Sequence, residues 1–462
     1  MESSISVRTS DIYHAATLLL QTGNVGLERA TRLLESIAGK DGDTDRDVAY
    51  SALSSALLKT GDADRALKYA NKALEISQQP MYYANLAQVQ MYQHKPLEAI
   101  ESCESGFKAL AQADVFDDQA NNQLLLKQAS AFNMARMYKN ARLQLEKLPG
   151  RPDFKTYLGM SRMAECDPTI FSAGFQAYGA RREAYKAMVP KVIHDSIFRR
   201  IELMGYCDWN ILLEQGLGDC VMMLPYILDL KKPSESSGHK RKIRIISLDG
   251  RHDDFVNDVA KFFCDDIIRA KCISSQDLHQ VSGGFLWMFD LLVDGIKRQA
   301  PYIQMEKQIV DLASQYRGKV GICWRGNRLH QNDHWRSASI NDFMPIIDKY
   351  GEDCVSLQYG LTQEERQLLN SFQVDKWETK GLTALIAVLS NLKSVITVDT
   401  AISHLAGAVG VKCVTLLPTN PDWRWGNHGS ESRPYGDSHR LARQIKCGDW
   451  SDPVNEAMRV IA

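Results

Sequence analysis

The stretch SVITVDTAISHLAGAVGVKCVTLLPTNPDWRWG (394–426) decides the fold class of this chain. It reads as an apolar strand over 394–398, a helix that starts after Thr400, and a second apolar strand over 413–417. Continuous apolar strands joined by helices are typical of a parallel sheet that is buried on both faces. The stretch therefore predicts an α/β domain with a ligand site at the carboxyl ends of its strands.

Further apolar runs extend this pattern over the last two thirds of the chain. We predict strands at NILLE (210–214), IRIIS (243–247), KVGICW (319–324) and CVSLQ (354–358). Their spacing fits two Rossmann-like halves, 205–315 and 316–446, whose strand ends face one cleft. The tail 447–462 predicts a C-terminal helix.

The first third of the chain consists of helical repeats. Segments 49–76 and 82–109 place equivalent residues 33 positions apart, with Leu53 matched by Leu86 and Ala66 by Ala99. Looser copies of the same helix–turn–helix layout lie at 14–35 and 124–148. The period and the small residues resemble tetratricopeptide repeats, whose stacked units bury a continuous core. We predict a repeat domain over 1–150, ended by PGRP (149–152), and a helical connector over 151–204.

Two uses of such a repeat array remain open from the sequence. Its concave surface could hold a protein or glycan acceptor or another protein partner. The array could equally be a packing scaffold or an oligomer interface. A homo-oligomer is therefore compatible with the sequence.

The first candidate site loop lies in NILLEQGLGDC (210–220), between a predicted strand and a helix. Gly216 and Gly218 allow close backbone approach, and the N–H groups of the helix start favour an anion or an anionic transition state. Asp219 stands at this helix start. An ordinary helix cap is the alternative interpretation of Asp219.

The second candidate loop, RGNRLHQNDHWRS (325–337), follows the predicted strand 319–324 and is rich in basic and amide side chains. Arg325, Asn327 and Arg336 suit a diphosphate, and Gln358 ends a predicted strand at the same rim. A solvated polar loop is the alternative. His330 and His334 lack a helix and a third ligand, so we predict no metal site.

The third candidate loop starts at Asp399 and Thr400, which end one strand and precede a helix. The N–H groups of that helix start suit a phosphate, and His404 lies one turn further on. Capping by Asp399 or Thr400, and a structural role for His404, are the alternatives. Trp423 follows the next strand and could stack on a base or sugar, or fill a groove.

Five segments together resemble glycosyltransferases of the bacterial heptosyltransferase type (glycosyltransferase family 9), especially those preceded by tetratricopeptide repeats. They are EQGLGDCVMMLPYILDL (214–230), WRGNRLHQNDHWRS (324–337), VSLQ (355–358), VDTAISHLAGAVG (398–410) and LPTNPDWRWG (417–426). The resemblance implies a GT-B architecture, in which two Rossmann-like domains face each other and the C-terminal one binds the nucleotide-sugar donor. It also implies inversion at the anomeric carbon without a metal or other cofactor.

The resemblance also implies roles for particular residues. Asp219 corresponds to the candidate general base, and the donor phosphates are expected at Asp399, Thr400 and His404, with help from Arg336. The family often has a lysine in the basic loop, where this chain has His334, Trp335 and Arg336. The full set expected to bind the donor is Gly216, Gly218, Trp324, Arg325, Gly326, Asn327, Arg336, Gln358, Asp399, Thr400, His404 and Trp423.

Composition limits the partners and the compartment. The 55 Lys and Arg residues against 56 Asp and Glu leave a formal charge of −1, which gives no global attraction to nucleic acid. The basic run 231–244 lacks stacking aromatics, so a nucleic acid acceptor is disfavoured without being excluded. The chain shows no secretory signal or membrane-spanning run, and its ten cysteines form no CxxC pair. We therefore expect a cytoplasmic protein.

Two other functions are compatible with the sequence. The chain could be a catalytically inactive repeat scaffold that binds a nucleotide or a protein, or a nucleotide-sugar epimerase, since fold alone does not fix chemistry. Neither the sugar, the nucleotide nor the acceptor follows from the sequence.

Overall fold

The computed structural model divides the chain into two compact units, which are described separately. One comprises Met1–Pro149 and Lys446–Gly448, the other Gly150–Ile445 and Asp449–Ala462. The structure describes residues 24–38, 46–165, 167–185, 208–231, 242–247, 252–260, 264–269, 284–292, 296, 301–328, 330, 332–378 and 381–461. The start of the chain, residues 39–45 and most of the basic run 231–244 lie outside these residues.

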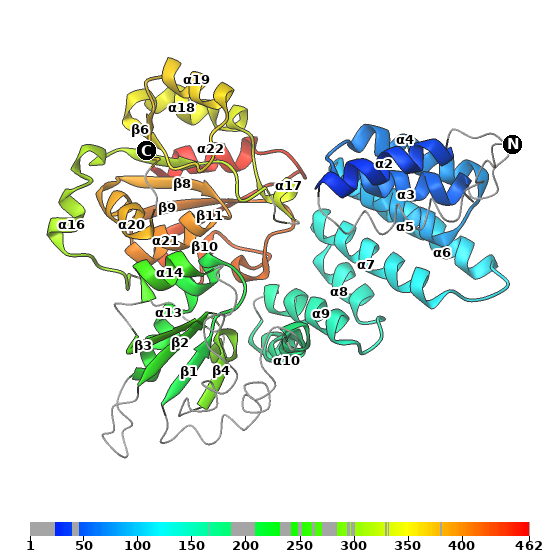
Figure 1. Ribbon diagram of the computed structural model, residues 1–462, viewed down its shortest axis with the longest axis horizontal. Coiled ribbons are helices and arrows are strands. Elements are labelled where there is room, and N and C mark those ends of the chain that lie inside the picture. The colour runs from blue at the N-terminus through cyan, green and yellow to red at the C-terminus, as the bar shows by residue number, and fades with distance from the viewer. Residues whose placement is uncertain are drawn as a thin grey trace, which may run out of the picture. The chain divides into compact units, whose positions relative to one another are not determined.

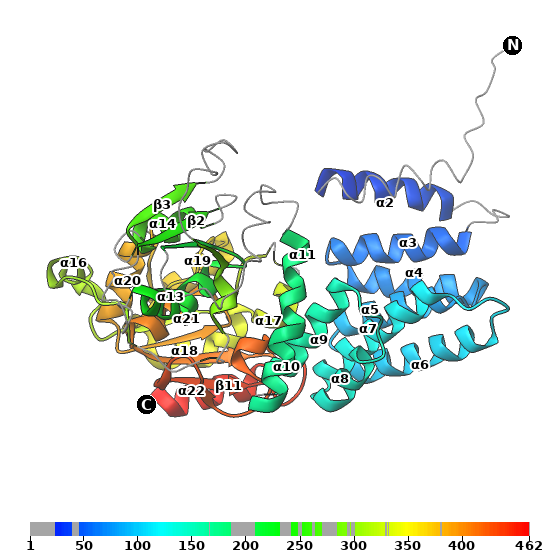
Figure 2. The same cartoon turned by 90° about the horizontal axis from the view of Figure 1, so that it is seen from below.

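The first unit is a stack of helices, coloured blue to cyan in Figures 1 and 2. Each helix packs on the next: α2 (Asn24–Ala38), α3 (Arg46–Lys59), α4 (Ala63–Ile76), α5 (Pro80–Tyr92), α6 (Pro96–Gln112), α7 (Asp118–Met134) and α8 (Tyr138–Leu145). The pairs α3–α4, α5–α6 and α7–α8 coincide with the predicted repeats.

Small residues at the repeat positions explain how closely these helices approach. Ala66, Ala70 and Cys103 are buried. A Cβ atom on Gly106 would lie 2.5 Å from Cδ2 of Leu124, so the glycine lets α6 and α7 approach closely. The repeat packing predicted from the sequence is confirmed.

Two parallel sheets form the core of the second unit. The first has the order β3-β2-β1-β4 and is parallel throughout, with β1 (Trp209–Leu212), β2 (Ile243–Ser247), β3 (Asp266–Arg269) and β4 (Gly284–Trp287). The second has the order β10-β11-β9-β8-β5-β6-β7 and is parallel except at β10. Its strands are β5 (Val320–Cys323), β6 (Cys354–Ser356), β7 (Asp375–Lys376), β8 (Ser394–Val398), β9 (Lys412–Leu417), β10 (Glu431–Ser432) and β11 (Gly436–Arg443). This is the α/β architecture of two Rossmann-like halves expected from the sequence.

All six strands expected from apolar runs are present. The remaining strands were not expected, because they are short or carry polar residues, as in DIIR and GDSHRLAR. They are β3, β4, β7, β10 and β11. The sheet helices are α13 (Leu217–Lys231), α14 (Asp253–Asp258), α16 (Lys307–Asp311), α17 (Asp333–Arg336), α18 (Met344–Tyr350), α19 (Gln363–Ser371), α20 (Leu382–Asn391) and α21 (Ala401–Val409). Among them α13, from the first half, packs on α21, from the second half. The C-terminal helix α22 (Ser451–Ile461) packs on β9 and β11.

A buried ion cluster anchors the connector helices α9 (Pro152–Ala164), α10 (Pro168–Tyr178) and α11 (Arg182–Tyr185). The guanidinium of Arg181 donates to both carboxylate oxygens of Glu214, at 2.8 and 2.9 Å, and to Asp290 at 3.0 Å. Arg182 donates to the same oxygen of Asp290 at 2.7 Å. Because Glu214 lies just beyond the end of β1, this cluster fixes the start of the first candidate loop.

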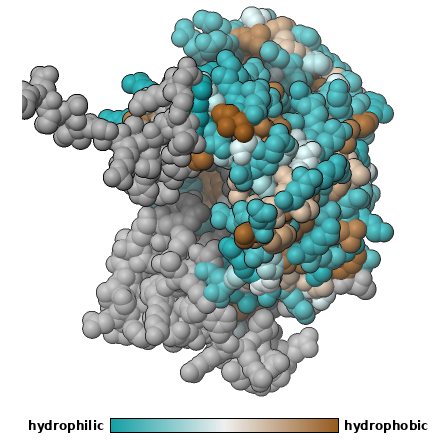
Figure 3. All heavy atoms as spheres, turned by 90° about the vertical axis from the view of Figure 1, so that its right-hand side faces the viewer, coloured by the Kyte–Doolittle hydropathy of each residue, from teal (hydrophilic) through white to brown (hydrophobic). Residues whose placement is uncertain are grey.

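The face of the molecule in Figure 3 is mainly hydrophilic, and its hydrophobic groups are small and separate. Exposed large apolar side chains of the repeat unit include Leu97, Val115 and Phe116. In the part of the chain that the structure describes, no helix combines the length and the apolar character needed to cross a membrane.

Candidate active site

Asp219 lies in the first turn of α13 and uses its two carboxylate oxygens differently. Its Oδ2 accepts a hydrogen bond of 2.8 Å from the backbone N–H of Gly216. Its Oδ1 forms an ion pair with Nε of Arg424. One oxygen of Asp219 thus binds the backbone at the helix start from the third position of α13, and the other faces a cation from the second half of the unit.

Arg424 lies in a short turn after β9, between Trp423 and Trp425. Only 7% of it is exposed. Its Nη1 donates to Asp422 at 2.6 Å, and its guanidinium carbon lies 4.8 Å from the ring centre of Trp423 and 5.2 Å from that of Phe289. A buried arginine held by two carboxylates and two aromatic faces is fixed in place.

These charges shift one another's protonation. Burial, with the carboxylates of Asp422 and Asp399, raises the pKa of Asp219 to about 6, although Arg424 and the Gly216 N–H oppose the shift. Burial and the charge of Asp422 likewise raise the pKa of Asp399, against the effects of Arg336 and Arg424. The side chain of Asp219 is 14% exposed. A carboxylate with this pKa can accept a proton near neutral pH.

The start of α21 lies beside the start of α13. Thr400 occupies the N-cap position, yet its side chain makes no capping hydrogen bond and lies instead 3.1 Å from the hydroxyl of Thr397. A Cβ atom on Gly218 would lie 2.5 Å from Cδ2 of His404. The structure thus brings the first and third candidate loops together, and the glycine at 218 permits this contact.

The basic loop divides into a buried start and a more exposed end. Nη2 of Arg325 donates to Glu365 at 2.9 Å and to the Gly360 carbonyl at 2.6 Å. Trp324 is fully buried, with its Nε1 donating to Glu365 at 3.0 Å, while Oε1 of Gln358 accepts from the N–H of Arg325 at 2.9 Å. These side chains support the loop from within the second half, and their predicted contact with a donor stays a prediction.

Arg336 ends the basic loop and acts on the start of α21. A Cβ atom on Gly326 would lie 2.6 Å from Nη2 of Arg336, so the glycine leaves room for the guanidinium. The charge of Arg336 lowers the pKa of Asp399 and of His404, although burial governs both groups. The backbone carbonyl of Asn327 accepts from the N–H of His330 at 2.9 Å.

Trp423 packs into an aromatic cluster instead of lying open to solvent. It is 2% exposed, and its ring centre lies 5.5 Å from that of Tyr178 in α10 and 6.0 Å from that of Phe289. The neighbouring Trp425 stacks on His404 at 4.8 Å. Of these two tryptophans, Trp425 is therefore the one in contact with His404 near the helix start.

Arg443 on β11 holds the turn that carries Arg424. Its three guanidinium nitrogens donate to the carbonyls of Gly429, Gly426 and Trp425, each at 2.8 Å. Arg424, Arg443 and Tyr435 did not stand out as site residues in the sequence. The available signal for Arg424 was its position between two tryptophans in PDWRW (421–425), inside a segment that carries the family resemblance.

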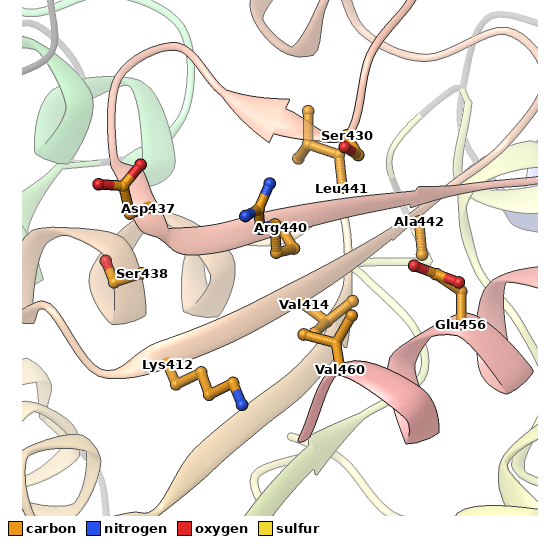
Figure 4. A pocket seen from close by; sticks show the side chains of 10 residues that line it. All are labelled: Lys412, Val414, Ser430, Asp437, Ser438, Arg440, Leu441, Ala442, Glu456 and Val460. Atoms are coloured by element: carbon orange, nitrogen blue, oxygen red, sulfur yellow. The ribbon is translucent and has the colours of Figure 1, made fainter. Parts of the chain in front are cut away.

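A cavity of about 420 Å³ lies elsewhere in the second half (Figure 4). It lies against β9, β11 and α22 and is lined by Lys412, Val414, Ser430, Asp437, Ser438, Arg440, Leu441, Ala442, Glu456 and Val460. None of the candidate site residues lines it, so this cavity is separate from the candidate site. The side chains that the structure describes include no group of three or more suited to hold a metal ion.

One family model matches part of the second half. The model of glycosyltransferase family 9 (heptosyltransferase) matches residues 378–448, which include α20, α21 and the turn with Arg424. A search of curated protein sequences finds no significant match.

Similar solved structures include two transferases and one repeat protein. ADP-heptose LPS heptosyltransferase II of E. coli has a TM-score of 0.40 and 10% identity, over 55% of this chain and 98% of its own. A mutant O-GlcNAc transferase of Thermobaculum terrenum has a TM-score of 0.36 and 11% identity, over 99% of this chain and 91% of its own. YrrB, a TPR protein with an unusual peptide-binding site, has a TM-score of 0.27 and 17% identity, over 39% of this chain and 89% of its own.

Proposed function

We propose that the second unit is a metal-independent, inverting glycosyltransferase that moves a sugar from a nucleotide-sugar donor to an acceptor hydroxyl. One observation carries the proposal. A carboxylate with a pKa of about 6, on Asp219 of the first half, meets Arg424 and the start of α21 from the second half. The family model that matches residues 378–448 supports the same activity.

Asp219 acts as the general base in this proposal. Its carboxylate takes the proton of the acceptor hydroxyl while that oxygen bonds to C1 of the donor sugar from the face opposite the diphosphate. The bond from C1 to the diphosphate oxygen breaks with its electron pair on the diphosphate, so the anomeric configuration inverts. The raised pKa suits this role, because a base that titrates near neutral pH accepts a proton readily.

The second half stabilises the leaving diphosphate in this proposal. The first N–H groups of α21 favour an anion, and Arg424 and Arg336 add positive charge without a metal. The donor set predicted from the sequence adds Gly216, Gly218, Gly326, Asn327, Asp399 and Thr400. The repeat unit would hold the protein or glycan acceptor.

A thermal-shift titration tests the donor site first. The full chain is titrated with UDP, GDP, ADP, CMP and their sugar conjugates, as wild type, Asp219→Ala, Asp399→Ala and the exposed control Asp353→Ala. A ligand that binds the folded state raises the melting temperature. We expect one nucleotide to stabilise wild type, Asp219→Ala and Asp353→Ala, and to lose its effect in Asp399→Ala.

Product analysis then tests the reaction. Proton NMR of the anomeric signal should show inversion, and the rate should persist in EDTA. Nucleotide release without an acceptor would favour hydrolysis or epimerisation instead. Stabilisation by none of the nucleotides at millimolar concentration would refute the proposal and favour an inactive repeat scaffold.

A further inference from the structure

A buried chain of hydrogen bonds runs from α13 to His404. The hydroxyl of Tyr302, in the segment between the two sheets, donates to the carbonyl of Val221 at 2.8 Å. Tyr302 is also hydrogen-bonded to the side chain of Tyr435. The hydroxyl of Tyr435 in turn lies 2.8 Å from Nδ1 of His404.

The carbonyl end of this chain sets the direction of every hydrogen bond in it. A carbonyl oxygen only accepts, so the single hydroxyl hydrogen of Tyr302 points to Val221. Tyr302 then accepts from Tyr435, whose own hydrogen is thereby used. The oxygen of Tyr435 must accept from His404, which places the hydrogen of His404 on Nδ1.

His404 is neutral, so one hydrogen on Nδ1 leaves Nε2 with a free lone pair. Burial, with the nearby charge of Arg424, lowers the pKa of His404 well below its usual range. Burial likewise keeps Tyr435 protonated by raising its pKa. No residue that the structure describes is hydrogen-bonded to Nε2 of His404.

Close packing fixes the orientation of the imidazole. Trp425 stacks on the ring at 4.8 Å, and a Cβ atom on Gly218 would lie 3.2 Å from Nε2. A Cβ atom on Gly407 would lie 2.3 Å from Cγ of Tyr435, so the tyrosine ring is seated directly on α21. The Cδ2 edge of the imidazole therefore lies against Gly218 at the start of α13, with Nε2 next to that edge, beside the loop of Asp219.

We propose that Tyr302 and Tyr435 are positioning residues that hold His404 with Nε2 as a hydrogen-bond acceptor, and that Nε2 binds a hydroxyl group of the substrate. A phosphate oxygen of a diphosphate diester carries no hydrogen to donate at neutral pH, so the helix start and the arginines bind phosphate while His404 recognises a ribose, sugar or acceptor hydroxyl. The identity of the ligand rests on the proposed function. The position of the hydrogen on His404 does not.

Nitrogen-15 NMR of the histidine-labelled full chain tests the position of the hydrogen. The His404 signals are identified by their loss in His404→Gln. We expect a protonated-type nitrogen shift at Nδ1 and an unprotonated-type shift at Nε2, unchanged between pH 6 and 8. The reverse pattern, or a titration in this range, would overturn the proposal whether or not the protein is a glycosyltransferase.

Two tyrosine variants test the positioning role. Tyr435→Phe removes the acceptor for Nδ1–H, so we expect the His404 pattern to change to the other tautomer or to a mixture. Tyr302→Phe should give a mixture, because Tyr435 is then free to donate to His404. The control Tyr350→Phe removes a buried hydroxyl of the same half that has no described hydrogen-bond partner and should leave the pattern intact. An unchanged pattern in both Tyr302→Phe and Tyr435→Phe would refute the role.

Calorimetry with His404→Leu tests the ligand class. The probes are the stabilising nucleoside diphosphate, its 2′-deoxy and 3′-deoxy forms, and inorganic sulfate, an anion that carries no hydrogen at neutral pH. We expect His404→Leu to bind sulfate like wild type. If a deoxy form binds wild type about tenfold more weakly than the parent nucleotide does, and both forms bind His404→Leu with equal affinity, the ribose is the source of the hydroxyl. If the deoxy forms bind normally, a raised KM of His404→Leu for sugar donor or acceptor identifies the source. A loss of sulfate affinity in His404→Leu would contradict hydroxyl recognition.

Discussion

The loop after β5 and the turn after β9 both follow parallel strands of the second sheet, and each holds a buried arginine. Arg325 pairs with Glu365 and the Gly360 carbonyl, both in its own half. Arg424 pairs with Asp219, which belongs to the other half of the unit. The two arginines are almost equally buried, at 8% and 7% exposure, so they differ in the origin of their partners and not in burial.

The contacts that hold the two segments in place also differ. Gln358 binds the backbone of Arg325 from a neighbouring strand end at 2.9 Å, which seats the arginine inside its half. Arg443 instead binds three carbonyls of the turn 425–429 and leaves the Arg424 side chain to reach across. Polar side chains of the second half thus hold Arg325 inside that half and leave Arg424 free to pair with the first half.

Replacing Arg424 should give the largest effect on activity. We expect Arg424→Met to lower kcat by about 100- to 1000-fold, because a fixed positive charge at the leaving diphosphate is lost. Steady-state transfer assays on the folded variant measure this. Arg325→Met assayed alongside should keep kcat within a few-fold; an equal loss in both variants would erase the distinction between the two arginines.

Replacing Arg325 should give the largest effect on stability. Arg325→Met leaves the carboxylate of Glu365 buried without its cation, which costs about 3–5 kcal/mol of unfolding free energy. Urea unfolding followed by tryptophan fluorescence measures the loss. The double variant Arg325→Met/Glu365→Leu should recover much of it, and an unchanged unfolding midpoint in Arg325→Met would contradict the supporting role.

The pH dependence sharpens the role of the Asp219–Arg424 pair. Burial raises the pKa of Asp219 to about 6, so transfer should increase with pH through that value as the base ionises. Arg424 opposes this shift, so its removal should move the acid limb of kcat/KM to higher pH. A raised carboxyl pKa also means that the contribution of Asp219 to folding stability falls as pH rises from about 4 through 6, and Asp219→Asn should abolish that fall. Activity profiles and urea unfolding across this pH range measure both effects, and an acid limb that stays in place in Arg424→Met would contradict the pairing.

Replacing Arg443 should give the smallest effect. Lysine keeps the charge but cannot reach three carbonyls at once, so Arg443→Lys should cost about 1–2 kcal/mol of stability and raise the donor KM a few-fold. Thermal unfolding and donor titrations measure both. A kcat as low as that of Arg424→Met would indicate that Arg443 acts on the reaction directly.

Much of the fold was predictable because its signals are local. Apolar runs located six strands, and a 33-residue period located the helix pairs. The short polar strands β7 and β10 carry no such signal, since sheet pairing alone makes them strands. The same limit applies to the site, where the sequence indicated Asp219 and the start of α21 from their place after strands.

The sequence by itself determined the repeat array, the two parallel sheets and the loops at which chemistry is expected, because periodicity, apolar runs and glycine positions act over short distances. Only the tertiary structure decided which polar side chains meet. The contact of Gly218 with His404, the pairing of Asp219 with Arg424 and the inward turn of Arg325 join residues that lie far apart in the chain. Their geometry depends on how the strands, helices and two halves pack, which no local pattern encodes.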